Sequence, residues 1–183
     1  MYSTVSKKES GESGFRLPCR NAWKGARKAD RALPVLLVCA LSLCLGGCLN
    51  LSMTPPDGFL VVAESRLEVK AASSDSALLW VRAFDDRHDG DLDFWTDALF
   101  NDYVDNRGYV LIEKNPIQAG DVKGEEMFFE TNSHGALQKY LVSLFVVDGV
   151  FGSTICVAEF VARSGPFETH LDAVRRAVTT LKF

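Results

Sequence analysis

The densest run of potential metal ligands in this sequence is Asp85–Asp93, which reads DDRHDGDLD. When its glycine is aligned with the invariant glycine of a calcium-binding EF-hand loop, the ligand positions fall on Asp85, Arg87, Asp89 and Asp91. Arg87 cannot bind a cation, and Thr96 stands where such a loop needs a bidentate glutamate. The run therefore predicts a solvated loop that leads into a helix with Asp91 as its N-cap, and no metal site.

Residue types that perform acid-base or nucleophilic chemistry are scattered along the chain. The histidines are His88, His134 and His170, and neither Gly-x-Ser-x-Gly nor His-Glu-x-x-His occurs. Glu125 and Glu126 are adjacent on a predicted strand, where consecutive side chains point to opposite faces, so they cannot act as a pair. The sequence thus predicts no catalytic residues, no cofactor and no enzyme activity, with a hydrolase kept as an alternative.

The run Leu33–Cys48, LPVLLVCALSLCLGGC, is uncharged and follows a segment with eight Lys and Arg against three Asp and Glu. A basic segment before a short apolar run is typical of a signal peptide, whose basic end stays in the cytoplasm. The apolar part, Ala32 to Gly47, is shorter than the roughly 20 residues of a membrane-spanning helix. Residues 1–47 are therefore predicted to be a signal peptide that is removed.

The end of this run, Leu45-Gly46-Gly47-Cys48, resembles the bacterial lipobox. The resemblance implies that the thiol of Cys48 is acylated, for example with palmitate, and that cleavage after Gly47 leaves Cys48 as the lipid-bearing N-terminus. At about 0.8 kcal/mol per buried CH₂, two or three acyl chains would attach the protein permanently. A plain secretory signal or an uncleaved anchor is the alternative.

The predicted location is the cell envelope, with the protein facing the periplasm. Leu49 follows the cysteine where an aspartate would resemble an inner-membrane retention signal, which favours the outer membrane. From Cys48 to Phe183 the chain holds 12 Lys and Arg against 21 Asp and Glu, a formal charge of −9. An acidic surface argues against nucleic acid and against electrostatic docking on anionic lipid, so the predicted membrane link is the lipid on Cys48.

Cys156 is the only cysteine after Cys48, so no intramolecular disulfide is expected beyond the acylated residue. We interpret Cys156 as a small buried hydrophobe in an apolar strand. Residues 48–57 contain Pro55 and Pro56 and are predicted to form a tether, and residues 58–183 form a single domain.

Apolar patterns in that domain predict strands and helices in alternating blocks. Strands are expected at Phe59–Glu64, Arg66–Ala71, Ala77–Phe84, Tyr109–Glu113, Gly124–Thr131, Leu137–Val147 and Val150–Ala162. Asn115-Pro116 and Gly120-Asp121 are expected to bracket a loop. Asp148-Gly149 between two apolar runs predicts a hairpin with a type I′ turn.

Two segments have the apolar spacing of amphipathic helices. The first, Leu92–Asn106, has a stripe of Leu92, Trp95, Leu99 and Tyr103, widened by Phe94, Phe100 and Val104, and Gly108 fits the position that ends it. The second begins at Ser164-Gly165-Pro166 and has a stripe of Phe167, Leu171, Val174, Val178 and Leu181. Leu137–Val147 is nearly all apolar and needs cover on both faces. The expected fold is α+β, with an antiparallel sheet of six to seven strands between two helices, an α/β/α sandwich.

This pattern resembles the PsbP-like fold, shared by the photosystem II extrinsic protein, a Ran-binding nuclear import factor and DcrB-type bacterial lipoproteins. The likeness rests on Gly108-Tyr109, the strand Gly124–Phe129, the segment Tyr140–Val147 and the ending Thr180–Phe183. It implies a non-catalytic accessory domain that binds an unidentified envelope protein, although fold alone does not fix function. The alternative is a carrier of a small ligand or metal, which would use the Asp-rich loop or a pocket between sheet and helix.

Overall fold

The computed structural model describes residues 50–86, 90–133, 135–149 and 152–183. The predicted signal peptide, the cleavage position at Gly47 and the lipidation position at Cys48 lie outside these ranges. So do Arg87, His88, Asp89 and His134.

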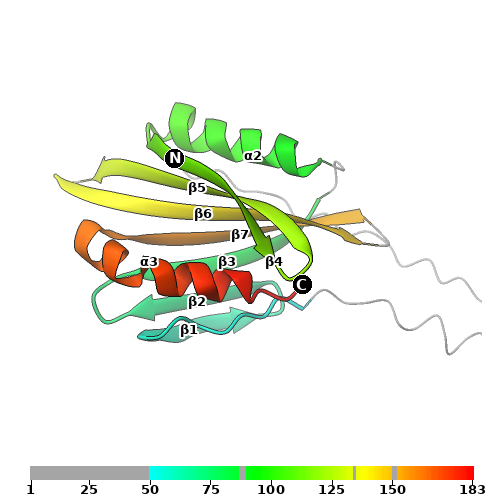
Figure 1. Cartoon of the computed structure of the whole chain (residues 1–183), viewed down its shortest axis with the longest axis horizontal. Coiled ribbons are helices and arrows are strands. Elements are labelled where there is room, and N and C mark those ends of the chain that lie inside the picture. The colour runs from blue at the N-terminus through cyan, green and yellow to red at the C-terminus, as the bar shows by residue number, and fades with distance from the viewer. Residues whose placement is uncertain (1–49, 87–89, 134, 150–151) are drawn as a thin grey trace, which may run out of the picture. The chain divides into compact units, whose positions relative to one another are not determined.

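Within the described ranges, seven antiparallel strands form one open sheet in the order β1-β2-β3-β7-β6-β5-β4 (Figure 1). The strands are β1 (Phe59–Ser65), β2 (Glu68–Ser73), β3 (Leu78–Asp85), β4 (Val110–Ala119), β5 (Val122–Ser133), β6 (Ala136–Gly149) and β7 (Gly152–Arg163). The helices are α2 (Leu92–Asn101), which continues as the π-helical turn η1 (Asp102–Asn106), and α3 (Ser164–Thr179). The predicted α+β class is confirmed, with β1 and β4 at the two edges.

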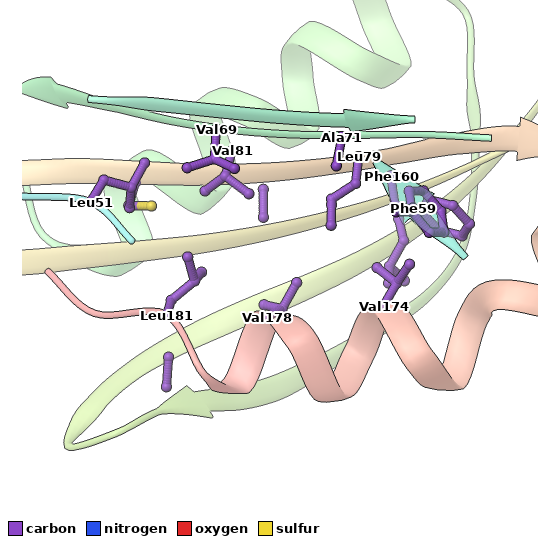
Figure 2. Close-up of a cluster of buried hydrophobic side chains, with 14 of the residues drawn as sticks. Leu51, Phe59, Val69, Ala71, Leu79, Val81, Phe160, Val174, Val178 and Leu181 are labelled. Carbon is purple, nitrogen blue, oxygen red and sulfur yellow. The ribbon is translucent and has the colours of Figure 1, made fainter. Parts of the chain in front are cut away.

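Two hydrophobic clusters, one with each helix, cover the two faces of the sheet. The α3 cluster joins Val174 and Val178 of the helix to strand residues such as Phe59, Val81 and Phe160 (Figure 2). The α2 cluster joins that helix and η1 to β5, β6 and β7 and contains no residue of β1, β2 or β3. The interior strand β6 alternates between them: Leu141 and Phe145 belong to the α3 cluster, and Val142 and Leu144 to the α2 cluster. The prediction that this strand is buried on both faces is confirmed.

The predicted start and stop of the first helix are also confirmed. The Asp91 side chain accepts a 2.8 Å hydrogen bond from the N–H of Phe94 and so caps α2. Gly108 has a φ of 70°, the left-handed conformation that favours glycine after a helix. The expectation that Phe94 widens the apolar stripe is wrong, because its side chain is 55 % exposed.

Two predicted connections are wrong. The loop expected between Asn115-Pro116 and Gly120-Asp121 does not form, since β4 runs through Pro116 to Ala119 and only a two-residue turn follows. Proline is tolerated there because β4 is an edge strand, which has a neighbouring strand on one side only. The Asp148-Gly149 turn is also displaced: Asp148 pairs with Ser153 and Gly149 with Gly152, so the strands continue beyond the expected reversal.

The segment Leu51–Pro56, which precedes β1, packs against the domain. Leu51 is 2 % exposed and belongs to the α3 cluster, and Ser52 pairs with Lys182 through two backbone hydrogen bonds. The N–H of Thr54 donates to the hydroxyl of Thr180. Leu51 thus packs against the domain although it lies inside the segment predicted as a tether. No helix in the described residues is long and apolar enough to cross a membrane.

Candidate functional site

A row of polar side chains crosses the α3 face of the sheet. Asn115 of β4 lies opposite Glu126 of β5, which lies opposite Ser143 of β6. Directly opposed residues point to the same face, so these three side chains form one row under α3. The rows on either side are apolar, with Phe128 and Leu141 on one side and Phe145 on the other. Packing of the apolar layer under α3 does not require polar residues at these positions, which singles the row out on this face.

The row is completed by Arg175, which reaches down from α3. Its Nε and Nη2 donate to Oε1 of Glu126 at 2.9 and 2.6 Å, and Oε2 of Glu113 lies 4.0 Å from Nη2. The Glu126 side chain is 6 % exposed and that of Arg175 is 36 % exposed. Donating hydrogen bonds to the Glu126 carboxylate raises the pKa of the Arg175 guanidinium above its usual value. Charge pairing therefore holds Arg175 in place over a carboxylate that water hardly reaches.

Two buried oxygens in this row lack a hydrogen-bond partner. They are Oε2 of Glu126 and the hydroxyl of Ser143, which sit on directly opposed residues. A buried polar atom without a partner is unfavourable, and such atoms are uncommon in folded proteins. The pair marks a place that a water molecule or a hydrogen-bonding ligand would stabilise.

A groove of about 410 Å³ opens beside this row, between β4 and α3. Its lining residues are Glu113, Asn115, Pro116, Ile117, Glu126, Arg175, Arg176 and Thr179. Two acidic and two basic side chains thus stand around an apolar strip formed by Pro116 and Ile117. The arrangement suits a small molecule that carries both a hydrogen-bond donor and an anionic or acceptor group.

A second polar network, around Glu159, lies toward the other face, and both carboxylate oxygens of Glu159 have a partner in it. The hydroxyl of Tyr103 donates to Oε1 of Glu159 at 2.5 Å, and Nη2 of Arg82 contacts Oε2 of Glu159 at 2.8 Å. The Arg82 guanidinium lies 3.9 Å from the centre of the Trp80 ring, whose Nε1 donates to Glu68. Burial and the Glu159 charge raise the pKa of Tyr103. This network connects η1 to β7 and β3, so we assign it a role in stabilising the fold.

The Asp-rich loop contributes a structural contact. Asp86 is 6 % exposed, and its Oδ2 accepts hydrogen bonds from the N–H of Gly90 at 2.7 Å and from Nε1 of Trp95 at 2.8 Å. The carboxylate thereby ties the end of β3 to the first turn of α2. Within the described ranges, no group of three or more His, Cys, Asp or Glu side chains could hold a metal ion.

The remaining candidates from the sequence have packing roles. His170 contacts Asp75 at 2.9 Å and packs edge-on against Phe59. Cys156 is fully buried, and burial raises its pKa to about 12, which confirms its interpretation as a core residue. Glu126 points to the α3 face, whereas Met127 belongs to the α2 cluster. Side chains alternate along a strand, so Glu125 shares the face of Met127 and does not act together with Glu126. The sequence pattern missed the Glu126–Arg175 pair, whose only local signal is a charged residue inside an apolar strand.

The two edge strands differ in how they meet solvent. On β1, Leu60 is 77 %, Val61 43 % and Val62 58 % exposed. The β4 edge also exposes Val110 and Ile112, but it carries Lys114 and Pro116 as well. Charged residues and proline are among the usual protections of an edge strand, and the stretch Phe59–Ala63 has neither. Its pairing with β2 does shift register between Val61 and Ala63.

The fold defines the class to which this chain can be compared: α+β domains with an open antiparallel sheet and two helices. No protein-family model and no curated protein matches the sequence. Among solved structures, it is similar to LpqN, a protein involved in cell envelope biogenesis of Mycobacterium tuberculosis, with 14 % identity and a TM-score of 0.60 over 73 % of this chain and 83 % of LpqN.

Two further structures align over most of their length. One is PA94 from Pseudomonas aeruginosa, with 9 % identity and a TM-score of 0.49 over 73 % of this chain and 97 % of PA94. The other is the Ran-binding protein Mog1p of Saccharomyces cerevisiae, with 12 % identity and a TM-score of 0.48 over 76 % of this chain and 92 % of Mog1p. At such identities, the similarity to LpqN shows the fold alone.

Proposed function

We propose that this protein is a lipid-anchored accessory protein of the cell envelope, with a non-catalytic domain that binds a partner protein. The anchor is Cys48, acylated and freed by cleavage after Gly47, and the domain faces the periplasm. The lipobox-like Leu45–Cys48 supports this address, and the outer membrane is favoured by Leu49. The involvement of LpqN in envelope biogenesis is consistent with the same setting.

The observation that carries partner binding is the bare edge of β1. An edge strand presents unpaired backbone N–H and C=O groups, and a partner can add its own strand to them. The exposed side chains of Leu60 and Val62 supply the apolar contacts that give such an addition its specificity. The β4 edge, with Pro116 and Lys114, is a poorer template.

Site-specific crosslinking in living cells tests this proposal. A photoreactive residue replaces Leu60 or, as a matched control on the other edge, Ile112, which is 50 % exposed. The expected result is one reproducible protein adduct from position 60 that is absent from position 112 and is lost when Val62→Lys is added. Identical adducts from both edges, or none from β1, would refute partner binding at this edge.

The groove beside α3 favours a second candidate function, the carriage of a small ligand. The observation is the buried unpartnered Oε2 of Glu126 next to a groove that contains both Arg175 and Arg176. Amino acids are suitable probes because they carry an ammonium and a carboxylate. A rise in melting temperature with one of them, lost in Glu126→Gln, supports the carrier function. No shift with any amino acid, and none with millimolar calcium, contradicts it.

A further inference from the structure

Leu51 and Ser52, near the start of the described chain, are hydrogen-bonded to Arg66 and Lys182, and we call these contacts the seam. The seam limits how the domain can be attached to a membrane. The N–H of Leu51 donates to the carbonyl of Arg66 in the β1–β2 turn, and Ser52 and Lys182 exchange backbone hydrogen bonds of 3.1 and 3.0 Å. The Leu51 side chain is buried in the α3 cluster, which also contains Val69 and Val81 (Figure 2). The chain is therefore held by the domain from Leu51 onward.

The stretch of sequence between Cys48 and this seam is short. Three residue steps separate Cys48 from Leu51, and an extended chain spans at most about 3.5 Å per residue, so their Cα atoms lie within about 10 Å of each other. A single domain of this size has a radius of gyration of about 14 Å and so a diameter of roughly 35 Å. The attachment is thus much shorter than the domain is wide. A free tether over residues 48–57 would instead reach about 30 Å.

We infer that the domain rests directly on the bilayer surface through the end that holds Leu51, Arg66 and Lys182. The inference rests on the proposed acylation of Cys48. The other end of the domain then faces away from the membrane, because the β1–β2 hairpin runs from Arg66 to the turn at Ser74 over the length of β1. Leu60 lies six residues before Arg66, so it stands at most about 20 Å farther from the surface than Arg66 does.

Chain length, and not charge, sets this orientation. Arg66 and Lys182 are basic and exposed, but Asp85 and Asp148 lie at the same end of the sheet, and the chain from Cys48 onward has a formal charge of −9. Attraction to anionic lipid would weaken as salt is added, whereas a covalent constraint does not. The contact is therefore insensitive to ionic strength.

Fluorescence quenching in reconstituted vesicles tests the inference. The acylated protein, in phosphatidylethanolamine and phosphatidylglycerol vesicles with a spin-labelled headgroup quencher, carries a fluorophore on one introduced cysteine. Arg66→Cys and Lys182→Cys report on the membrane end, and Ser74→Cys and Asn132→Cys on the far end. All four positions are exposed, and the buried Cys156 is not labelled. Several-fold stronger quenching is expected at 66 and 182 than at 74 and 132, at low and high salt alike.

A spacer insertion provides the matched control. About ten Gly and Ser residues between Asn50 and Leu51 leave the seam intact and add an average reach of about 18 Å. Quenching at 66 and 182 should then fall to the level at 74 and 132. If mass spectrometry shows that the protein is acylated and quenching is equal at all four positions, the proposed orientation is wrong, whereas the proposed lipid anchor is retained. Absence of acylation at Cys48 overturns both.

Discussion

The substitution Arg175→Met tests whether the Glu126–Arg175 pair stabilises the α3 face. It removes both hydrogen bonds to a carboxylate that is 6 % exposed and keeps an unbranched side chain over the groove. Removing one partner of a buried ion pair costs about 3–5 kcal/mol because the other charge stays buried. The Arg175 side chain is itself 36 % exposed, so water can enter its place, and we expect a loss of about 2–3 kcal/mol.

Two further variants separate the charge from the packing. Glu126→Gln removes the charge, and the double variant with Arg175→Met should lose less than the sum of the two single losses, by about 1 kcal/mol or more. Arg176→Met is the matched surface control and should change stability by less than about 0.5 kcal/mol. Urea unfolding of chain 48–183 with Cys48→Ser, followed by circular dichroism, gives each free energy. If Arg175→Met costs no more than Arg176→Met, the pair does not stabilise the domain and Glu126 is already solvated.

Three other predictions follow from the core and its titratable groups. Leu51→Ala should lower the free energy of unfolding by about 2–4 kcal/mol, and a loss below that of an exposed-site control such as Leu60→Ala would contradict the seam. Burial raises the pKa of Cys156 to about 12, so iodoacetamide should label it only in urea; rapid labelling of the native protein would refute its burial. Burial also raises the pKa of Tyr140 to about 12 from a usual 10. The stabilisation from this shift is complete below the unfolded pKa and is lost as pH rises from about 10 to 12, which alkaline urea titrations of wild type and Tyr140→Phe would show.

Most of the fold could be predicted because burial imposes a period on the sequence. The alternation of Leu141 to Phe145 between two clusters follows from a strand covered on both faces. The stripe of Leu92, Trp95, Leu99 and Tyr103 likewise follows from one helix face meeting the sheet. The predictions were wrong where the local sequence favours one conformation and the position of the segment in the sheet allows another. Asn115-Pro116 has the sequence of a turn but lies in an edge strand, where proline is tolerated.

The candidate site could not be predicted because its residues are distant in the sequence. Glu126 and Arg175 are 49 residues apart, and Tyr103 and Glu159 are 56 apart. Periodicity places each residue on a face but does not say which charge stands opposite it. The docking of Leu51 was missed for a related reason: the Pro55-Pro56 pair signals irregular backbone, and irregular backbone can still pack against a core.

The most direct test of the lipid anchor at Cys48 is mass spectrometry of the N-terminus of the native protein recovered from membranes. The proposed anchor predicts that the chain begins at Cys48 and that this residue carries fatty acid. A native chain that retains residues 1–47, or one that begins at Cys48 in the soluble fraction without fatty acid, would contradict it.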